Sequence, residues 1–396
     1  MCDNKIITLK GPERVRKRPQ VIFGSEDVQG AWQAVRSLLE IYATEALLGH
    51  CKHLSVKQDG ETVEISGDDR GLYLGQDTGE DAPWQQIFCE MYPLPAYRPE
   101  EGAYSLGLLQ STHHMLYGDQ PTPDSVYYPD ERGYFELYTA QCVCKGVDVT
   151  VCRAGVRSVL HFEKGENVGG ITHIPTTDRN GTAFRLVLDR EVFTETVIPA
   201  RLFLNALETF AILIPGLSCT YENAKLRKHF CYPEGSAGYV QSKSGVPAYA
   251  ACLAAKGRER YNRAEYAARV EVAIGYTPNA GGVKCLHNFR ELTHGGSHLK
   301  ALEESLCAAF NSCYRAKLEG APVKLRELRR HLTVLLVSQC HPYSTLWVNG
   351  ARTGITNQVI ADMTTDVMKP AFENFVYAHK AQFSDLIDRI LAERIK

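Results

Sequence analysis

Apolar and polar residues alternate along the chain with two periods, one typical of helices and one typical of strands. Residues 28–49 repeat apolar side chains at helical spacing and predict an amphipathic helix. The two runs after it, 53–58 and 62–66, are typical of strands, and the pair Asp59-Gly60 between them predicts a tight hairpin turn. We therefore expect a helix followed by a β-hairpin in this part of the chain.

The same patterns extend the prediction along the rest of the chain. Further strands are expected at 135–139, 146–153, 157–164, 182–188, 268–276 and 332–337. Further helices are expected near 84–91, at 106–116, 198–213 and 297–316, and after residue 357. Residues 234–244 are rich in Gly and Ser and indicate a domain boundary. Helices with antiparallel strands come first and a mixed second half follows, so the predicted fold class is α+β.

Composition and charge narrow the class of protein. The 396 residues are 44% hydrophobic and 23% charged, which excludes general disorder and suits two domains. Lys and Arg number 44 against 46 Asp and Glu, so we expect direct DNA binding to be weak or absent. No apolar run is long enough to span a membrane, and the N-terminus lacks the apolar core of a signal peptide. A cytoplasmic protein is therefore expected.

Several short motifs follow one another along the chain. They are Leu9-Lys10-Gly11, Val15-Arg16-Lys17-Arg18-Pro19, Gly24, Glu45-Ala46-Leu47-Leu48-Gly49-His50-Cys51, Arg70-Gly71, Gly181-Thr182 and Gly295-Gly296-Ser297-His298-Leu299. In these residues and their spacing, the chain resembles the N-terminal ATPase and transducer regions of the DNA gyrase B subunit and of its topoisomerase IV counterpart, which are GHKL ATPases. The resemblance covers essentially the whole chain.

This resemblance implies a fold and a domain organisation. It implies a GHKL (Bergerat-type) α/β sandwich over residues 1–235, followed by a ribosomal-S5-like transducer domain of the α+β type over residues 236–396. The TOPRIM region that follows in the family has no counterpart in these residues, so we expect that the chain does not pass DNA strands by itself. Because the family dimerises through its N-terminal arm, a homodimer is expected.

The resemblance also assigns catalytic positions, and some of them hold different residues in this chain. The family's general base, a Glu on the first long helix, maps to Ser37, whose hydroxyl is a poor proton acceptor at neutral pH. The Asn that holds Mg²⁺ one turn later maps to Ile41, which has no ligand oxygen. The Glu and Arg that pair at the pocket wall are retained as Glu45 and Arg70. We therefore expect an intact wall without the base and the metal ligand.

The position that reads adenine is also changed. The family's Asp, which accepts a hydrogen bond from the adenine amino group, maps to Gly67, and Asp68 and Asp69 follow directly. A shift of one residue would restore a carboxylate, although the Arg70 anchor argues against such a shift. Thr182 matches the Thr of the family's Gly-Thr strand.

The phosphate-binding loop and the sensor loop of the transducer depart from the family as well. Gly102 and Gly107 are retained, whereas Tyr104 and Ser105 stand within what is a glycine-rich cradle in the family. The Lys that the transducer sends to the γ-phosphate is not matched, because Arg352 is the only basic residue in that stretch and comes too late. Base, metal ligand, adenine Asp, phosphate glycine and sensor Lys are thus all replaced, and ATP hydrolysis is not expected.

Tyrosines and cysteines near these positions have simple explanations. Tyr42, Tyr73 and Tyr104 fall at or near the former nucleotide pocket, where they fill the space of ATP or line a pocket for another ligand. Cys142 and Cys144 lack the spacing of a zinc site, so no metal site is predicted. The thirteen cysteines are expected to be reduced thiols.

Three functions remain open on this basis. The first is a gyrase-B-like pseudo-ATPase that acts by binding or dimerisation, with no cofactor expected and with a gyrase or topoisomerase subunit, a second copy or a small molecule as its partner. The second is an ATP- and Mg²⁺-binding type II topoisomerase B-type subunit that works with separate DNA-cleaving chains. The third is a nucleotide pocket repurposed for another small molecule or reaction. Its candidate groups are Ser37, Glu45, Asp68, Asp69, Arg70, Tyr104 and Ser105.

Overall fold

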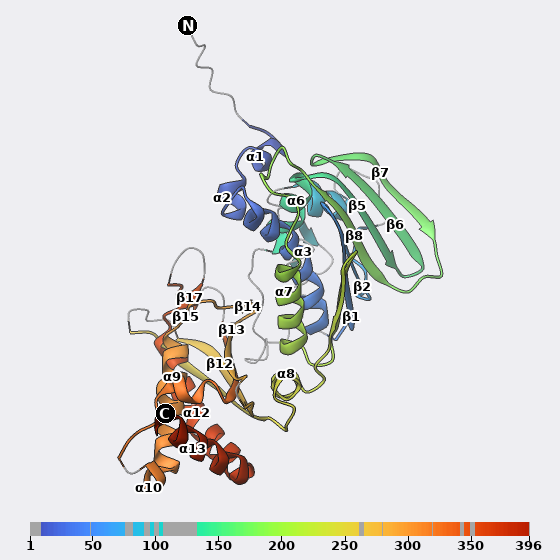
Figure 1. Cartoon of the computed structure of the whole chain (residues 1–396). Helices are drawn as coiled ribbons and strands as arrows, with labels where there is room; N and C mark the ends of the chain where they lie inside the picture. Colours follow the sequence, from blue (N-terminus) through green and yellow to red (C-terminus); the bar gives the residue numbers. More distant parts are fainter. Residues whose placement is uncertain are drawn as a thin grey trace. The chain divides into compact units, whose positions relative to one another are not determined.

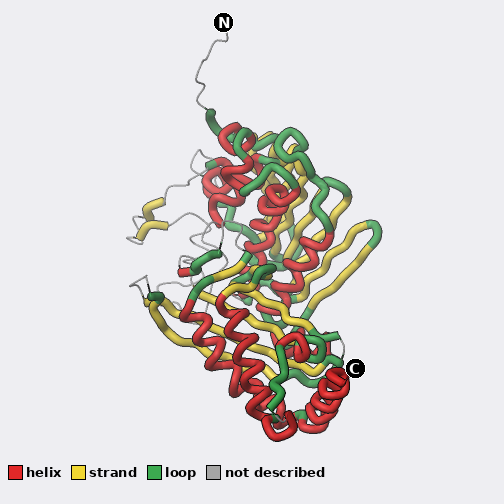
Figure 2. The backbone as a smooth tube through the Cα atoms, turned by 60° about the vertical axis from the view of Figure 1, so that its left-hand side comes forward, coloured by secondary structure: helices red, strands yellow, loops and turns green. Residues whose placement is uncertain are grey.

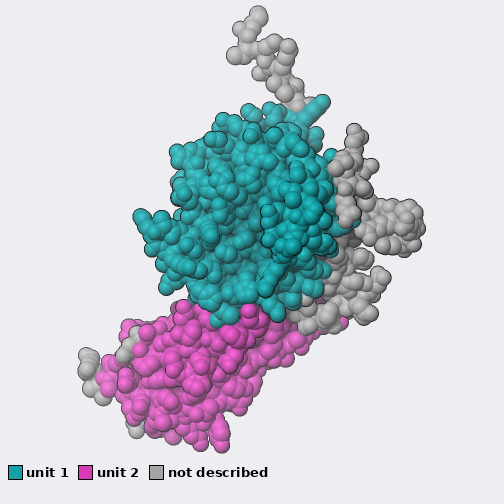
Figure 3. Space-filling model, turned by 90° about the vertical axis from the view of Figure 1, so that its right-hand side faces the viewer, with its two compact units in different colours: residues 1–122, 130–210, 217–231 teal, residues 123–129, 211–216, 232–396 magenta. Residues whose placement is uncertain are grey.

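The chain folds into two compact units, as a computed structural model shows (Figures 1 and 3). The structure describes residues 9–47, 49–75, 82–90, 96–98, 103–105, 133–260, 265–278, 280–318, 320–340, 344–348 and 353–395. The first unit comprises residues 1–122, 130–210 and 217–231, and the second comprises residues 123–129, 211–216 and 232–396. Each unit has a β-sheet of its own.

An eight-stranded sheet forms the centre of the first unit. In spatial order its strands are β10 (Leu226–Phe230), β9 (Ser218–Asn223), β1 (His53–Asp59), β2 (Thr62–Gly67), β8 (Gly181–Leu188), β5 (Cys144–Arg153), β6 (Val156–Glu163) and β7 (Glu166–Pro175). Neighbouring strands are antiparallel except β1 and β9, which are parallel. The five strands predicted in this region between residues 53 and 66 and between 146 and 188 are confirmed as β1, β2, β5, β6 and β8.

The described helices of the first unit lie against one face of this sheet (Figures 1 and 2). They are α1 (Glu13–Arg16), α2 (Pro19–Phe23), α3 (Val28–Leu47), α4 (Pro83–Cys89), α6 (Gly133–Cys142) and α7 (Ala200–Leu213). Along β8, Thr182, Phe184 and Leu186 are buried, and the residues between them are less so. This alternation follows from the pleat of a strand, which turns every second side chain toward the helices. Helix α3 confirms the helix predicted at 28–49.

The second unit is built on a five-stranded sheet. In spatial order its strands are β11 (Tyr249–Arg258), β12 (Glu265–Tyr276), β16 (Leu332–Cys340), β13 (Gly282–His287) and β14 (Arg290–Glu291). Its helices are α8 (Gly235–Ser244), α9 (Ser297–Cys313), α10 (Arg315–Leu318), α11 (Leu325–Leu328), α12 (Gln358–Ala378) and α13 (Lys380–Ile395). Strand β16 is buried at every position because both of its faces are covered. Val334 and Leu336 join the cluster formed by α9 and α12, and Leu335 packs with Val240 of α8.

The structure corrects one of the predicted elements. Residues 135–139 belong to helix α6 and do not form a strand. Leu137, Tyr138 and Ala140 of this segment are all buried, and a short apolar run of this kind does not distinguish a buried helix from a strand. Residues 234–244, whose Gly and Ser content indicated a domain boundary, include helix α8, and the long segment of the second unit begins close by at residue 232. The helix predicted at 106–116 lies outside the described residues.

Among the residues that the structure describes, no helix is long and apolar enough to cross a membrane.

Candidate functional site

An ion pair joins helix α3 to the turn that follows β2. The Arg70 guanidinium donates from Nη2 to Glu45 Oε1 at 2.6 Å and from Nε to Glu45 Oε2 at 2.9 Å. A guanidinium that holds both oxygens of a carboxylate forms the strongest kind of protein ion pair, and this bond raises the pKa of Arg70. The two residues expected to pair at the pocket wall are thus brought together.

We predict that Glu45→Gln lowers the free energy of unfolding by about 2 kcal/mol, because Arg70 loses its charged partner in a half-buried place. Urea unfolding measures this change. Glu304→Gln is the matched control, since its pair with Lys300 lies on the surface with both side chains at least 70% exposed. The control should cost less than about 0.5 kcal/mol. Equal losses in the two variants would contradict a structural role for the Glu45 pair.

Ser37 and Ile41 lie on α3 two turns and one turn before Glu45, on the same stripe of the helix. Both side chains are buried. The Ser37 hydroxyl donates to the Ala34 carbonyl at 2.7 Å, so its proton is used within the helix. Ile41 offers no atom that could hold Mg²⁺. At these two positions the helix therefore offers neither a general base nor a ligand for Mg²⁺.

One acidic side chain on this helix was not predicted from the sequence. Glu40 is buried three residues after Ser37, and its Oε1 accepts a hydrogen bond from Arg36 Nε at 2.9 Å. An Arg and a Glu four residues apart within an apolar stretch would have been the signal. The Arg36 guanidinium thus engages the Glu40 carboxylate within the helix.

The Tyr42 ring closes the space beside Gly67. A Cβ atom on Gly67 would lie 2.4 Å from Cδ1 and 2.7 Å from Cε1 of Tyr42. The ring is fully buried. Its hydroxyl donates to the carbonyl of Thr182 on β8, the strand next to β2, at 2.8 Å. Burial raises the pKa of Tyr42. The position to which the resemblance assigns the adenine-reading Asp therefore has no room for any side chain while Tyr42 is in place.

The two carboxylates that follow Gly67 accept hydrogen bonds from different neighbours. Asp69 is buried, and its oxygens accept hydrogen bonds from the Thr182 hydroxyl at 2.8 Å, the Thr182 N–H at 2.9 Å and the Gly71 N–H at 2.7 Å. Burial raises the pKa of Asp69. Asp68 instead accepts from the N–H groups of Lys52 and His53 and from the His53 ring. The carboxylate beside Thr182 is thus Asp69.

A second arginine, which the sequence analysis missed, reaches the same turn. Arg153, the last residue of β5, donates from Nη1 to the Gly71 carbonyl at 2.6 Å, and its guanidinium carbon lies 5.7 Å from the centre of the Tyr73 ring. Gly71 has a φ of +77°, and a Cβ there would lie 2.5 Å from the Cys152 carbonyl oxygen. Only glycine fits both the conformation and the contact. Arg153 carried no motif, so the sequence offered no signal for it.

Some predicted site residues lie wholly or partly outside the described residues. Gly102 and Gly107 lie outside them. The backbone of Tyr104 and Ser105 forms strand β4 (Ala103–Ser105), which pairs antiparallel with β3 (Ala96–Arg98). Arg352, the basic candidate in the sensor stretch, also lies outside.

Residues 344–348, the described part of the stretch expected to carry the sensor Lys, are hydrogen-bonded to other residues of the second unit. The Leu346 N–H donates to Asn357 Oδ1 at 2.8 Å, and Asn357 Nδ2 donates to the Ser344 carbonyl at 2.8 Å. The Thr345 hydroxyl lies 3.0 Å from His287 Nε2. Asn357 immediately precedes α12, so this loop is tied to the start of that helix.

Within the described ranges, no group of three or more His, Cys, Asp and Glu side chains is placed to hold a metal ion. Cys142 and Cys144 are buried free thiols at the junction of α6 and β5. Burial raises the pKa of Cys142 to about 12, so this thiol stays protonated at neutral pH.

Comparisons with known proteins match both units. The DNA gyrase B family model matches residues 235–395. The gyrase B protein of Thermotoga maritima is 26% identical over 77% of this chain and 46% of its own length, and the topoisomerase IV counterpart from Enterococcus faecalis is 24% identical over 79% of this chain and 43% of its own length. The 43K ATPase domain of Thermus thermophilus gyrase B, solved with an aminocoumarin, aligns with a TM-score of 0.64 at 18% identity, covering 97% of this chain and 95% of that domain.

The eight-stranded sheet with helices on one face, followed by the second α+β unit, is the fold of the solved gyrase B ATPase domains, so the predicted fold class is confirmed. In sequence the chain is similar to the N-terminal region of gyrase B subunits. The chain spans about half the length of the first curated relatives that it matches, 46% and 45%.

Proposed function

We propose that this gyrase-B-like chain has a degenerate nucleotide site and acts by binding or by dimerisation, without hydrolysing ATP. The observation that carries the proposal is the Tyr42 ring against Gly67, which leaves no room for the adenine-reading carboxylate. Ser37 and Ile41 support it, because they offer neither a general base nor a Mg²⁺ ligand. The Glu45–Arg70 pair is retained from the family's polar wall, and this pair stabilises the fold with or without a nucleotide.

The proposal extends to the parts of the chain and to its partners. The first 235 residues act as the ATPase-like domain and residues 236–396 as the transducer. A second copy of the chain is the proposed partner, and a gyrase or topoisomerase subunit is the next candidate, because the relatives are named as gyrase and topoisomerase IV subunits. No bound nucleotide and no Mg²⁺ are required.

Release of inorganic phosphate from ATP tests this function directly. The wild-type chain should release no phosphate above the buffer rate at saturating ATP and Mg²⁺. Ser37→Glu with Ile41→Asn restores the family's base and metal ligand, and it should remain inactive because Tyr42 still closes the pocket. The ATPase domain of a gyrase B relative serves as the positive control. Turnover by the wild-type chain at the rate of that control would overturn the proposal.

A second candidate function is supported by Asp69. This buried carboxylate bonds to Thr182, the residue that matches the family's Gly-Thr strand, and could replace the missing Asp at Gly67 in an ATP-binding site with rearranged contacts. Under this alternative the chain is an ATP-binding B-type subunit that works with separate DNA-cleaving chains. Asp69→Asn distinguishes the two, because it abolishes nucleotide binding only if Asp69 reads the base.

A further inference from the structure

The face of the eight-stranded sheet that turns away from the helices carries a hollow of about 300 Å³. Its floor is a row of small side chains across four strands. The strand registers place Ser55 opposite Ser66, Ser66 opposite Ala183 and Ala183 opposite Thr150. On each strand the residues on either side of this row are buried or face the helices, so the four side chains project to the outer face.

The hydroxyl groups of this floor are available to a ligand. In the part of the chain that the structure describes, the hydroxyl groups of Ser55, Ser66 and Thr150 make no hydrogen bond to the protein. The next outward row contains Glu64, Arg185 and Asp148. Arg185 lies 3.6 Å from Glu64 and 3.5 Å from Asp148, so these larger side chains are paired with one another beside the floor.

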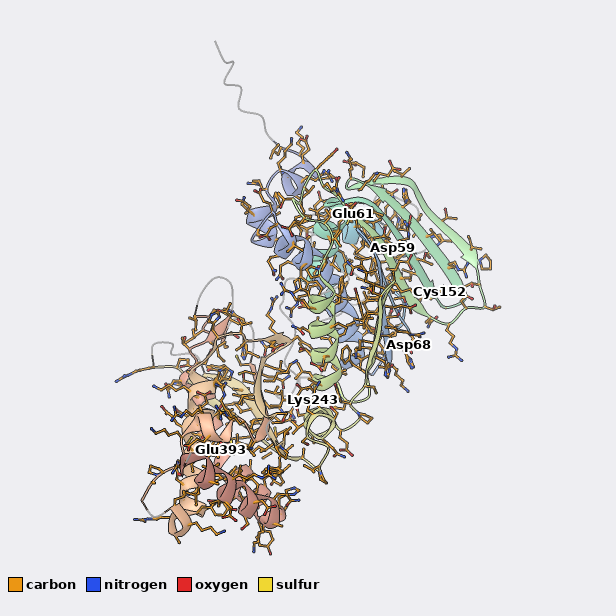
Figure 4. All side chains as sticks on the ribbon, in the orientation of Figure 1. Asp59, Glu61, Asp68, Cys152, Lys243 and Glu393 are labelled. Carbon is orange, nitrogen blue, oxygen red and sulfur yellow. The ribbon has the colours of Figure 1, made fainter. Side chains whose placement is uncertain are left out.

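One end of the hollow is formed by His53 and Asp68. The Asp68 carboxylate accepts from His53 Nδ1 at 2.6 Å and from the backbone N–H groups of Lys52 and His53, each at 2.7 Å. These bonds engage the carboxylate and fix the ring, so Nε2 is the ring nitrogen that is left for a ligand. Cys152 lines the hollow from β5, opposite Gly181, and Figure 4 shows it at the same end of the sheet as Asp68.

The turn that leads into β8 lies at this same end of the strands, because Gly181 is opposite Cys152 and beside Gly67. Arg179 and Asn180 line the hollow there. The neighbouring Asp178 is already paired with Arg157. Arg179 makes no ion pair within the described residues, so its positive charge is not compensated. The lining therefore combines the Arg179 cation and hydroxyl donors with the Asp68 carboxylate, whose oxygens are already hydrogen-bonded to Lys52 and His53.

We propose that this hollow binds a small molecule with an exposed oxyanion, of the phosphate monoester class. The Ser55, Ser66 and Thr150 hydroxyls would donate to the phosphate oxygens, and Arg179 would supply the opposing charge. The volume suits a small phosphorylated metabolite and is at the lower limit of ordinary ligand sites. The floor lies on the face opposite the Tyr42 ring, while Gly67, Asp68 and Thr182 border both this hollow and the degenerate nucleotide site.

Calorimetric titration of the whole chain with inorganic phosphate and with glycerol 3-phosphate tests this site. We expect saturable binding in the millimolar range or tighter for both, and no binding of glycerol. Arg179→Ala and Ser66→Val should each weaken binding about tenfold, which corresponds to about 1.4 kcal/mol. Ser66 is exposed on a strand, where Val is well tolerated, and circular dichroism verifies the fold of each variant.

Lys57→Ala is the matched control. Lys57 is an exposed cation on the same face of β1 but does not line the hollow, so its removal changes the net charge as Arg179→Ala does. It should leave phosphate binding within about twofold of the wild type, apart from the weak effect of a distant surface charge. Absence of saturable phosphate binding, equal losses in Lys57→Ala and Arg179→Ala, or equal binding of glycerol would each overturn the proposal.

Discussion

Gly67→Asp is expected to destabilise the protein by at least about 3 kcal/mol and not to restore nucleotide binding. The new Cβ would overlap the Tyr42 ring, and its carboxylate would be buried beside Asp69 in a place that is already filled. Tyr42→Ala opens this space at a cost of about 3–5 kcal/mol, as for other buried aromatic residues. The double variant should lose less than the sum of the two single losses, by about 2 kcal/mol. Urea unfolding of the four proteins measures this coupling.

Gly67→Ala separates the steric effect from the effect of the charge. It should cost about 1–3 kcal/mol, because even a methyl group meets the Tyr42 ring. Gly146→Ala on β5 of the same sheet is the control, since its new Cβ would meet only the Phe162 carbonyl oxygen at an ordinary 3.8 Å. Additive losses for Tyr42 and Gly67, or equal losses for the two alanine variants, would show that the ring does not close the pocket.

The second large effect is a loss of stability in acid that originates in the second unit. His287 and His298 are fully buried. Burial, with the neighbouring His298, lowers the pKa of His287 to about 3, and burial lowers the pKa of His298 to about 4. Both rings stay neutral in the folded chain, whereas in the unfolded chain they take up protons below about pH 6.5. Their contribution to the free energy of unfolding is therefore complete above about pH 6.5 and is lost as the pH falls toward about 4. The loss is on the order of 3 kcal/mol per histidine.

Urea unfolding at a series of pH values between 7 and 4.5 measures this dependence. His298→Asn should reduce the slope of unfolding free energy against pH by about one proton. Its effect at pH 7 should be smaller, because the ring makes one described hydrogen bond, between Nε2 and Cys285 Sγ at 2.9 Å. His229→Gln, at an exposed position on β10, should leave the slope unchanged. An unchanged slope in His298→Asn would contradict the assignment.

The sequence predicted the elements with strong patterns and missed those without them. Helix α3 and the hairpin of β1 and β2 carry a clear period and an Asp-Gly turn, so their positions could be predicted. Strands β10 and β11 could not, because β10 is a short edge strand of mostly polar residues and β11 is rich in Ala. Neither has the β-branched alternation that predicts a strand.

The candidate site was predicted at the positions that motifs mark and not at those that only the fold brings together. Glu45 and Arg70 lie 25 residues apart, and their motifs led to the expected pair. The closure of Gly67 by Tyr42 and the bond from Arg153 to Gly71 depend on side chains that meet across separate elements. No spacing along the chain encodes such contacts, although the resemblance did place Tyr42 at or near the former pocket, where it was expected to fill the space of ATP or to line a pocket for another ligand.

Calorimetric titration with ATP and with a non-hydrolysable analogue, with and without Mg²⁺, measures whether the pocket beside Tyr42 still binds a nucleotide. The Tyr42 ring closes the adenine position, and the described part of the pocket offers no side chain for the metal at Ser37 or Ile41. The account therefore predicts no binding heat up to millimolar nucleotide. Saturable binding at micromolar nucleotide that requires Mg²⁺ and is lost in Asp69→Asn would contradict it and would establish an ATP site built around Asp69.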